Sequence, residues 1–160
     1  LASEMKDISN KFFWLDADVN CLRKTSVKDI EKFLPLDDEL MTYLGRDSFP
    51  ADYPHTETGF LGFNKLHKSF HLYMNTLKNF YVTGEFFTLP RLHDCLIYDT
   101  AREIFETSKV KFRCLSGQYK SAEHPFIYCG LGEFFDHLKG PERKSQGFSK
   151  ERLDKEICVV

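Results

Sequence analysis

The sequence contains no long hydrophobic run, no CxxC pair and almost no net charge. Its 160 residues carry a formal net charge of −2, which offers no general attraction to nucleic acid or to an anionic membrane surface. No apolar segment approaches the roughly 20 residues that a membrane-spanning helix requires, and no signal peptide is visible. We therefore expect no nucleic-acid partner and no transmembrane segment, and a cytoplasmic location is favoured.

The cysteines are few, scattered and odd in number. They are Cys21, Cys95, Cys114, Cys129 and Cys158. Their spacing indicates neither a structural zinc site nor a disulfide framework, so reduced and buried thiols are expected.

Apolar residues make up 42% of the chain and include 16 Phe, which is enough for one domain with a real core. Strands are predicted at Lys11–Asp16, Met41–Gly45, Gly59–Phe63 and Val110–Leu115. Helices are predicted at Val27–Phe33, Leu66–Val82 and Arg91–Phe105, the last opened by Pro90. Short apolar pieces follow at Phe126–Cys129 and Glu133–Phe135, and loops are predicted at Arg46–Thr58 and after Gly140. This alternation predicts an α/β fold, in which ligands bind at the carboxyl ends of strands.

An acidic pair, Asp16 and Asp18, directly follows the apolar segment KFFWL. Both carboxylates can reach one divalent cation, and oxygen ligands of this kind suit Mg²⁺ or Mn²⁺. Because KFFWL is apolar on both faces, we expect its strand to be central in the sheet and Trp14 to lie in the core. The aromatic pairs Phe80–Tyr81 and Phe86–Phe87 are also assigned to the core, with a sugar-stacking surface as the alternative.

A second cluster lies in the segment HLKGPERK near the C-terminus. The imidazole of His137 can complete a metal site. Gly140 permits a close approach of the backbone to a phosphate. Lys139, Arg143 and Lys144 supply local positive charge, and arginine can bind phosphate through two hydrogen bonds.

The string HLKGPER resembles the His-x-x-Gly-x-x-Lys signature of the retaining glycosyltransferases that include glycogenin and bacterial lipopolysaccharide galactosyltransferases. The string FFWLDADV is similar to the Asp-x-Asp motif of the same family. This resemblance implies that Asp16, Asp18 and His137 hold Mn²⁺ (or Mg²⁺) and that Gly140 and Arg143, with Lys139 and Lys144, bind the diphosphate. It implies an A-type, Rossmann-like nucleotide-diphospho-sugar transferase fold. The expected reaction transfers a hexose from a nucleotide diphosphate sugar to a hydroxyl of a sugar, glycan or protein.

The middle of the chain extends the resemblance. The strand ETGFLGFN falls where the family borders the donor sugar and acceptor, and LHDCLIYD falls where the family has an acidic motif beside the donor sugar. The residues that this implies are Glu57, Thr58, Gly59, Asn64 and His93 for substrate binding and Asp94 for catalysis.

The family's fold opens with strands and helices that hold the nucleotide, whereas few residues precede Asp16 here. We therefore expect residues 1–144 to be the carboxy-terminal catalytic portion, without the nucleotide-binding start, and residues 145–160 to be a tail. A sheet that lacks those strands would have a bare apolar edge, so self-association is expected.

Two other functions fit parts of the sequence. LDADV also matches the opening motif of haloacid-dehalogenase-type phosphatases, with Asp16 as nucleophile and Asp18 as general acid. That chemistry requires a later lysine and an acidic pair at a downstream strand end. The other alternative is a non-catalytic carbohydrate-binding or assembly module derived from a glycosyltransferase.

Overall fold

A mixed four-stranded sheet forms the centre of the structure, a computed structural model that describes residues 9–46, 56–116 and 125–149. The strand order is β1-β4-β3-β5, with antiparallel pairing except between β3 and β5, which are parallel. Their bounds are Lys11–Leu15 for β1, Glu39–Gly45 for β3, Thr56–Asn64 for β4 and Lys111–Cys114 for β5. The predicted α/β class is confirmed at this level, as a mixed sheet with helices.

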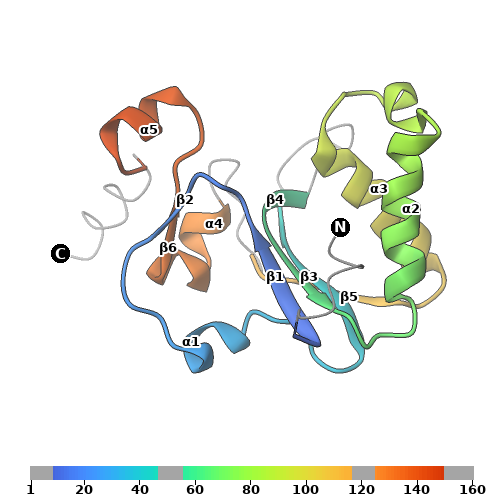
Figure 1. The fold of residues 1–160 in the computed structure, drawn as a ribbon, viewed down its shortest axis with the longest axis horizontal. Coiled ribbons are helices and arrows are strands. Elements are labelled where there is room, and N and C mark those ends of the chain that lie inside the picture. Colours follow the sequence, from blue (N-terminus) through green and yellow to red (C-terminus); the bar gives the residue numbers. More distant parts are fainter. Residues whose placement is uncertain (1–8, 47–55, 117–124, 150–160) are drawn as a thin grey trace.

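Two helices, α2 (Phe70–Val82) and α3 (Asp94–Thr107), cover one face of this sheet (Figure 1). The buried side chains of α2 recur at helical spacing, which gives the helix one apolar stripe. They are Phe70, Tyr73, Leu77 and Phe80. Together with Leu61 and Phe63 of β4 they form the first hydrophobic core. The short 3-10 segment η1 (Glu85–Thr88) lies between the two helices in the chain.

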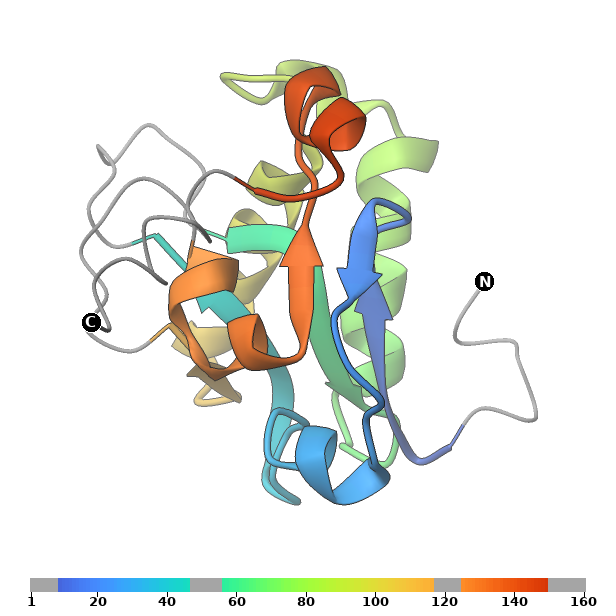
Figure 2. The ribbon, with the colours of Figure 1, turned by 90° about the vertical axis from the view of Figure 1, so that its left-hand side faces the viewer.

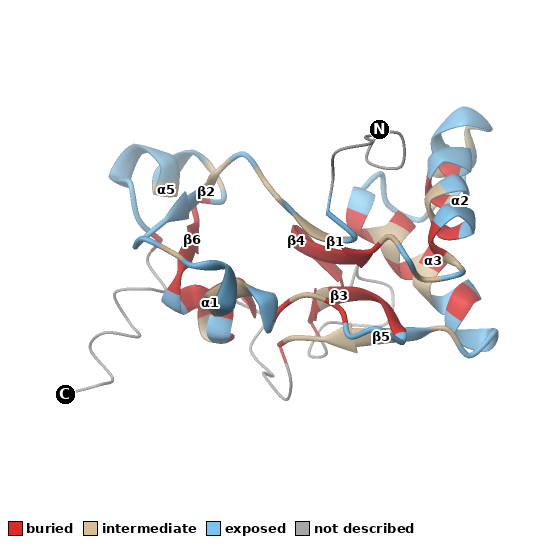
Figure 3. Cartoon of the chain, turned by 60° about the horizontal axis from the view of Figure 1, so that its bottom comes forward, coloured by how far each residue is buried: buried red, intermediate tan, exposed pale blue. Residues whose placement is uncertain are grey.

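A smaller layer packs against the other face of the sheet. It contains α4 (Pro125–Tyr128), the 3-10 segment η2 (Gly130–Glu133), and β2 (Val19–Cys21) paired antiparallel with β6 (Phe135–His137). Its core includes Phe33, Leu44, Phe60, Phe126, Leu131 and Phe134. Figure 3 shows the buried residues concentrated on β3, β4 and β6, with exposed positions on the outer sides of the helices. The sheet therefore separates two cores.

Two short helices lie at the periphery of this second layer. The first, α1 (Val27–Glu31), begins with a capping box, because the Ser26 hydroxyl accepts from the Asp29 amide and the Asp29 carboxylate accepts from the Ser26 amide. The second, α5 (Pro141–Gln146), follows β6, and Figure 2 shows β6 leading into it.

Strand β4 is irregular where it approaches the second layer. The partner of Tyr43 on β3 is Leu61, whereas the partner of the next residue, Leu44, is Glu57. This shift is a bulge, which changes the direction of neighbouring side chains. As a result Glu57 contacts the layer that contains β6, while Thr58 contacts α3.

The strand that ends before Asp16 lies at an edge of the sheet, so its predicted central position is wrong. Within the described ranges, β1 pairs only with β4. Trp14 is therefore 58% exposed rather than part of the core. Tyr81 and Phe87 are exposed as well, whereas Phe80 is buried as predicted.

Several predicted boundaries also differ. The helix expected from Leu66 starts at Phe70, because a turn with a hydrogen bond from His67 to Asn64 precedes it. Pro90 does not open the next helix, which starts at Asp94.

Two predicted loops differ too, and one short apolar piece is assigned to defined elements. Instead of a loop after Gly140, α5 forms with Pro141 at its start. The piece Glu133–Phe135 ends η2 and begins β6. In the loop predicted at Arg46–Thr58, β4 already begins at Thr56, and residues 47–55 lie outside the described part.

Four of the five cysteines lie in the described residues. Cys21, Cys95, Cys114 and Cys129 are reduced thiols, although Cys21 is exposed, and Cys158 lies outside the described residues. No helix in the described ranges combines the length and apolar character needed to cross a membrane.

Gly132 is required for the turn that leads into β6. A Cβ atom at this position would lie 1.9 Å from the backbone oxygen of Ile127. We expect Gly132→Ala to lower the free energy of unfolding by about 2–3 kcal/mol, because backbone cannot move aside as a side chain can. In the matched control Gly130→Ala, the nearest atom is Cε1 of Phe33 at 3.2 Å, and the loss should stay below about 1 kcal/mol. Urea denaturation measures both, and equal losses would contradict the prediction.

Candidate metal centre

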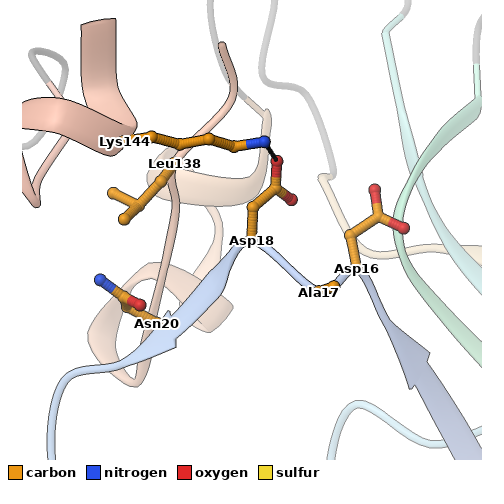
Figure 4. Close-up of a pocket in the computed structure, with 6 residues that line it drawn as sticks. All are labelled: Asp16, Ala17, Asp18, Asn20, Leu138 and Lys144. Atoms are coloured by element: carbon orange, nitrogen blue, oxygen red, sulfur yellow. Dashed lines mark ion pairs between the residues drawn. The ribbon is translucent and has the colours of Figure 1, made fainter. Parts of the chain in front are cut away.

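Asp16 and Asp18 lie in the turn that connects the central sheet to β2. The turn is closed by a hydrogen bond of 3.1 Å from the Val19 amide to the Asp16 carbonyl. The Asp16 amide donates to the Gly59 carbonyl at 3.2 Å, which attaches the turn to β4. The spacing of one residue thus places two carboxylates on one tight turn (Figure 4).

His137 reaches this turn because β6 pairs with β2. His137 is opposite Val19 in the register, and the Leu138 amide donates to the Asp18 carbonyl at 2.9 Å. The imidazole lies directly on Gly59, where a Cβ atom would be 2.7 Å from its Nδ1 and Cε1 atoms. Phe126 packs on the ring with its centroid 5.5 Å away. A glycine in β4 therefore provides the space for the histidine.

The three side chains converge, as the sequence predicted. Nε2 of His137 is 3.2 Å from Oδ1 of Asp18 and 3.8 Å from Oδ2 of Asp16. One ligand atom from each residue lies within 4.8 Å of the others. A cation with ligand distances of about 2.0–2.6 Å fits between atoms separated in this way. His137 is 1% exposed, whereas both carboxylates remain accessible.

The protonation states also suit a cation. Burial lowers the pKa of His137 below its usual 6.5, although the charges of Asp18 and Asp16 oppose this. Burial alone would raise the pKa of Asp18, but the hydrogen bond from Lys144 and the charge of His137 outweigh it, and the pKa lies below 3.8. At pH 7 the site therefore offers a neutral imidazole and an ionised carboxylate, the forms that bind metal.

Glu57 lies behind the imidazole. It is 3% exposed, and its Oε1 is 4.0 Å from Nδ1 of His137. Its other oxygen pairs with Arg46 and, at 3.4 Å, with Lys139. Buried carboxylates need such partners. The structure thus places a charge-compensated Glu57 next to His137, on the inner side of the site.

Of the predicted basic residues, Lys144 contacts one of the two aspartates directly. Nζ of Lys144 is 3.0 Å from Oδ2 of Asp18 (Figure 4). Arg143 donates to the Lys139 carbonyl at 2.9 Å, within the turn formed by Gly140, whose φ of +88° favours glycine. A pocket of about 580 Å³ opens here. Its lining residues are Asp16, Ala17, Asp18, Asn20, Leu138 and Lys144.

The remaining predicted residues fall into two places. Asp94 lies at the start of α3, where its carboxylate accepts from the Thr58 hydroxyl at 3.2 Å and lies 3.1 Å from Nδ1 of His93. Thr58 is the neighbour of Gly59, so this group adjoins the metal candidates. Asn64 does not: it pairs with Lys11 at the far end of β1 and β4, and its side-chain amide donates to the carbonyls of Asp37 and Glu39 at the start of β3.

Two further residues contact the candidate site and were not predicted from the sequence. Arg46 pairs with Glu57, and the sequence assigns this arginine only to a loop. The indole N–H of Trp14 donates to Oδ1 of Asp16 at 3.2 Å. Trp14 precedes Asp16 by two residues, and alternate residues of a strand share a face. This spacing could have indicated that the two side chains are neighbours.

A scan of the chain against protein-family models and searches of curated proteins and of solved structures returned no match.

We expect His137 to titrate below pH 6.5 in the metal-free protein. Asp18→Asn should lower this pKa further, because it removes a negative charge that favours the imidazolium. A folded-state pKa below the unfolded one means that the unfolded chain binds more protons, so the free energy of unfolding decreases as pH falls through about 6.5.

The measurement is an NMR titration of the histidine Cε1 protons, with His137 assigned from His137→Gln. Asp29→Asn is the control, since Asp29 caps α1, and it should leave the His137 pKa unchanged. A pKa at or above 6.5, or one raised by Asp18→Asn, would show that the described electrostatics are wrong.

Proposed function

We propose that the protein is a metal-dependent glycosyltransferase that moves a hexose from a nucleotide diphosphate sugar to an acceptor hydroxyl, with retention. The observation that carries this proposal is the convergence of Asp16, Asp18 and His137 next to a basic helix. Two carboxylates and one imidazole suit Mn²⁺ or Mg²⁺, and the adjacent positive charges suit a diphosphate. The mixed sheet with helices is compatible with the α/β class, to which the A-type transferase fold belongs.

The metal ligands in this proposal are Asp16, Asp18 and His137. A bound cation would neutralise the charge that develops on the diphosphate leaving group. The Glu57 carboxylate lies 4.0 Å behind Nδ1 of His137, on the side of the ring away from the proposed ion. His137 is buried against Gly59 and Phe126, which pack on its ring.

The diphosphate would bind along the segment from Lys139 to Lys144. Lys144 already lies at the Asp18 carboxylate, so a phosphate next to the ion meets its positive charge. Gly140 leaves open space, since no atom lies within 4 Å of a Cβ built there. The guanidinium of Arg143 can supply two hydrogen bonds to phosphate. Localised positive charge is needed because the chain as a whole is slightly acidic.

The sugar groups would lie where β4 meets α3. Thr58 and Gly59 line this junction, and Asp94 is a half-exposed carboxylate held by Thr58. We assign to Asp94 the position beside the donor sugar, with His93 next to it.

A phosphatase of the haloacid-dehalogenase type is less well supported. Its acidic pair would have to follow a downstream strand beside Asp16. On β4, the carboxylate of Glu57 is instead paired with Arg46 and Lys139. That mechanism also gives no role to His137, which lies 3.2 Å from Asp18. A non-catalytic carbohydrate-binding module remains the alternative, and metal and nucleotide binding distinguish it from the enzyme.

Mn²⁺ should bind to the wild-type chain, and Asp18→Asn and His137→Gln should each weaken this binding by about tenfold or more. The single tryptophan gives a direct signal, because Trp14 is hydrogen-bonded to Asp16 and paramagnetic Mn²⁺ quenches a nearby indole. Isothermal titration calorimetry provides the affinities.

Asp37→Asn is the matched control for the metal experiment. It makes the same chemical change at the other end of β1, where Asp37 pairs with Lys11, and it should leave Mn²⁺ binding unchanged. If the wild type does not bind Mn²⁺, or if all three variants bind equally, the proposed metal centre is wrong.

Alanine variants of Arg143 and Lys144 should weaken the binding of nucleoside diphosphates more than they affect folding, whereas Lys139 is left unchanged because it pairs with the buried Glu57. A charge-assisted bond to phosphate contributes about 1.5–3 kcal/mol, equivalent to roughly tenfold to a hundredfold in affinity. An exposed ion pair contributes little to stability.

The test titrates UDP, GDP and ADP in the presence of Mn²⁺, with thermal denaturation in parallel. Lys28→Ala, on the exposed surface of α1, is the control. Unchanged nucleotide affinity in both variants would mean that the basic segment is only a solvated surface.

A further inference from the structure

Trp14 presents an exposed aromatic ring beside a candidate metal ligand. It is the single tryptophan of the chain and is 58% exposed. Phe12, two residues earlier, packs on Phe63 and Phe70 at the start of α2. Strand alternation therefore places Trp14 on the face of the sheet that α2 and α3 cover. Large exposed aromatic surfaces of this kind often mark ligand sites.

A second carboxylate lies on the same face. Asp94 accepts from the hydroxyl of Thr58, a residue of β4 that faces α3. The next residue, Gly59, accepts from the Asp16 amide. Two consecutive residues of β4 therefore connect Asp94 with the turn that carries Asp16, and Asp16 in turn accepts from the Trp14 indole.

Tyrosine side chains lie close to both carboxylates. Burial is the main reason that the pKa of Tyr98 rises to about 12, and the neighbouring Tyr81, Asp94 and Asp16 add to the rise. Tyr81 is exposed, and its ring lies 5.4 Å from that of Phe86. The surface beside Asp16 thus combines aromatic rings with acceptor-only carboxylates.

We propose that Trp14 forms a subsite for the acceptor sugar, in which a pyranose ring stacks on the indole and its hydroxyls donate to the Asp94 carboxylate, so that Asp94 lies between the acceptor and the donor sugar. This inference rests on the proposed glycosyltransferase function and specifies its acceptor as a carbohydrate. Trp14 does not line the pocket that contains Asp18 and Lys144. The donor diphosphate and the acceptor would therefore approach Asp16 from different sides.

The chemistry of the surface favours a neutral polyhydroxyl ring over other ligands. Carboxylates only accept hydrogen bonds, and sugar hydroxyls donate them. An anionic group would be repelled by Asp16 and Asp94, and a purely apolar partner would leave both carboxylates buried without compensation. A cationic ligand is disfavoured, because the charge of Asp16 is assigned to the metal ion. A pyranose ring supplies both an apolar face for the indole and hydroxyls for the carboxylate.

The experiment titrates the full chain, in Mn²⁺ and UDP, with methyl glucoside, methyl galactoside and methyl mannoside. The emission of Trp14 should shift with at least one glycoside and should not shift with sorbitol, which has no ring face. A lysine-containing peptide is tested in parallel. No response to any glycoside, or saturable binding of the peptide instead, would overturn the proposal.

Variants separate stacking from an indirect effect on Asp16. Trp14→Ala should weaken glycoside binding, measured by saturation-transfer NMR, by roughly tenfold, equivalent to about 1.4 kcal/mol. Trp14→Phe keeps an aromatic face but loses the N–H donor, and its binding should stay within about threefold of the wild type. Leu36→Ala, at a side chain with the same 58% exposure, should change nothing. Equal losses in Trp14→Phe and Trp14→Ala would show that Trp14 only positions Asp16.

The control for the proposed function is Mn²⁺ binding by calorimetry, which needs no tryptophan. If the wild type binds Mn²⁺ and UDP but Trp14→Ala binds glycosides normally, only the acceptor subsite is wrong. If Mn²⁺ and UDP do not bind at all, the proposed function itself fails.

Discussion

The short pairing of β2 with β6 is the interaction on which the candidate centre depends. It aligns Val19 with His137 and joins Leu138 to the Asp18 carbonyl, so it brings together two segments from opposite ends of the chain. Because side chains alternate along a strand, a slip of one residue would turn His137 to the other face of this ladder. The strands have only three residues each, so the register must be secured elsewhere. The packing of Phe134 and Phe135 in the second core provides this.

The imidazole of His137 is closely packed by its surroundings. Gly59 leaves room for the imidazole, and the bulge in β4 directs Glu57 toward the same ring. The charge of Glu57 is buried, but Arg46 and Lys139 compensate it. Removing one member of such a buried group leaves an uncompensated charge, which is strongly destabilising. The support of the centre and the stability of the second layer are therefore coupled.

The sequence predicted local secondary structure well, but it was misleading where the position of a residue depends on which strands pair with each other. The apolar segment before Asp16 does form a strand, and the stripe of α2 is buried as its spacing predicts. The position of β1 at the sheet edge was not predictable from KFFWL. Apolar residues on both faces of a strand indicate that other elements cover these faces, but they do not indicate how many strands pair with it. The exposure of Trp14 follows from the same strand order, which only long-range pairing determines.

By itself, the sequence determined which groups could bind a cation and a phosphate. Asp16 and Asp18 share a turn because they are neighbours, and the basic residues cluster because they are consecutive. The tertiary structure alone decided that His137 reaches the aspartates, that Glu57 lies behind it, and that Asn64 lies at the far end of the sheet. The physical reason is that ligand geometry depends on strand register and on the bulge in β4. Both depend on contacts between residues that are distant in the chain, and no local pattern encodes them.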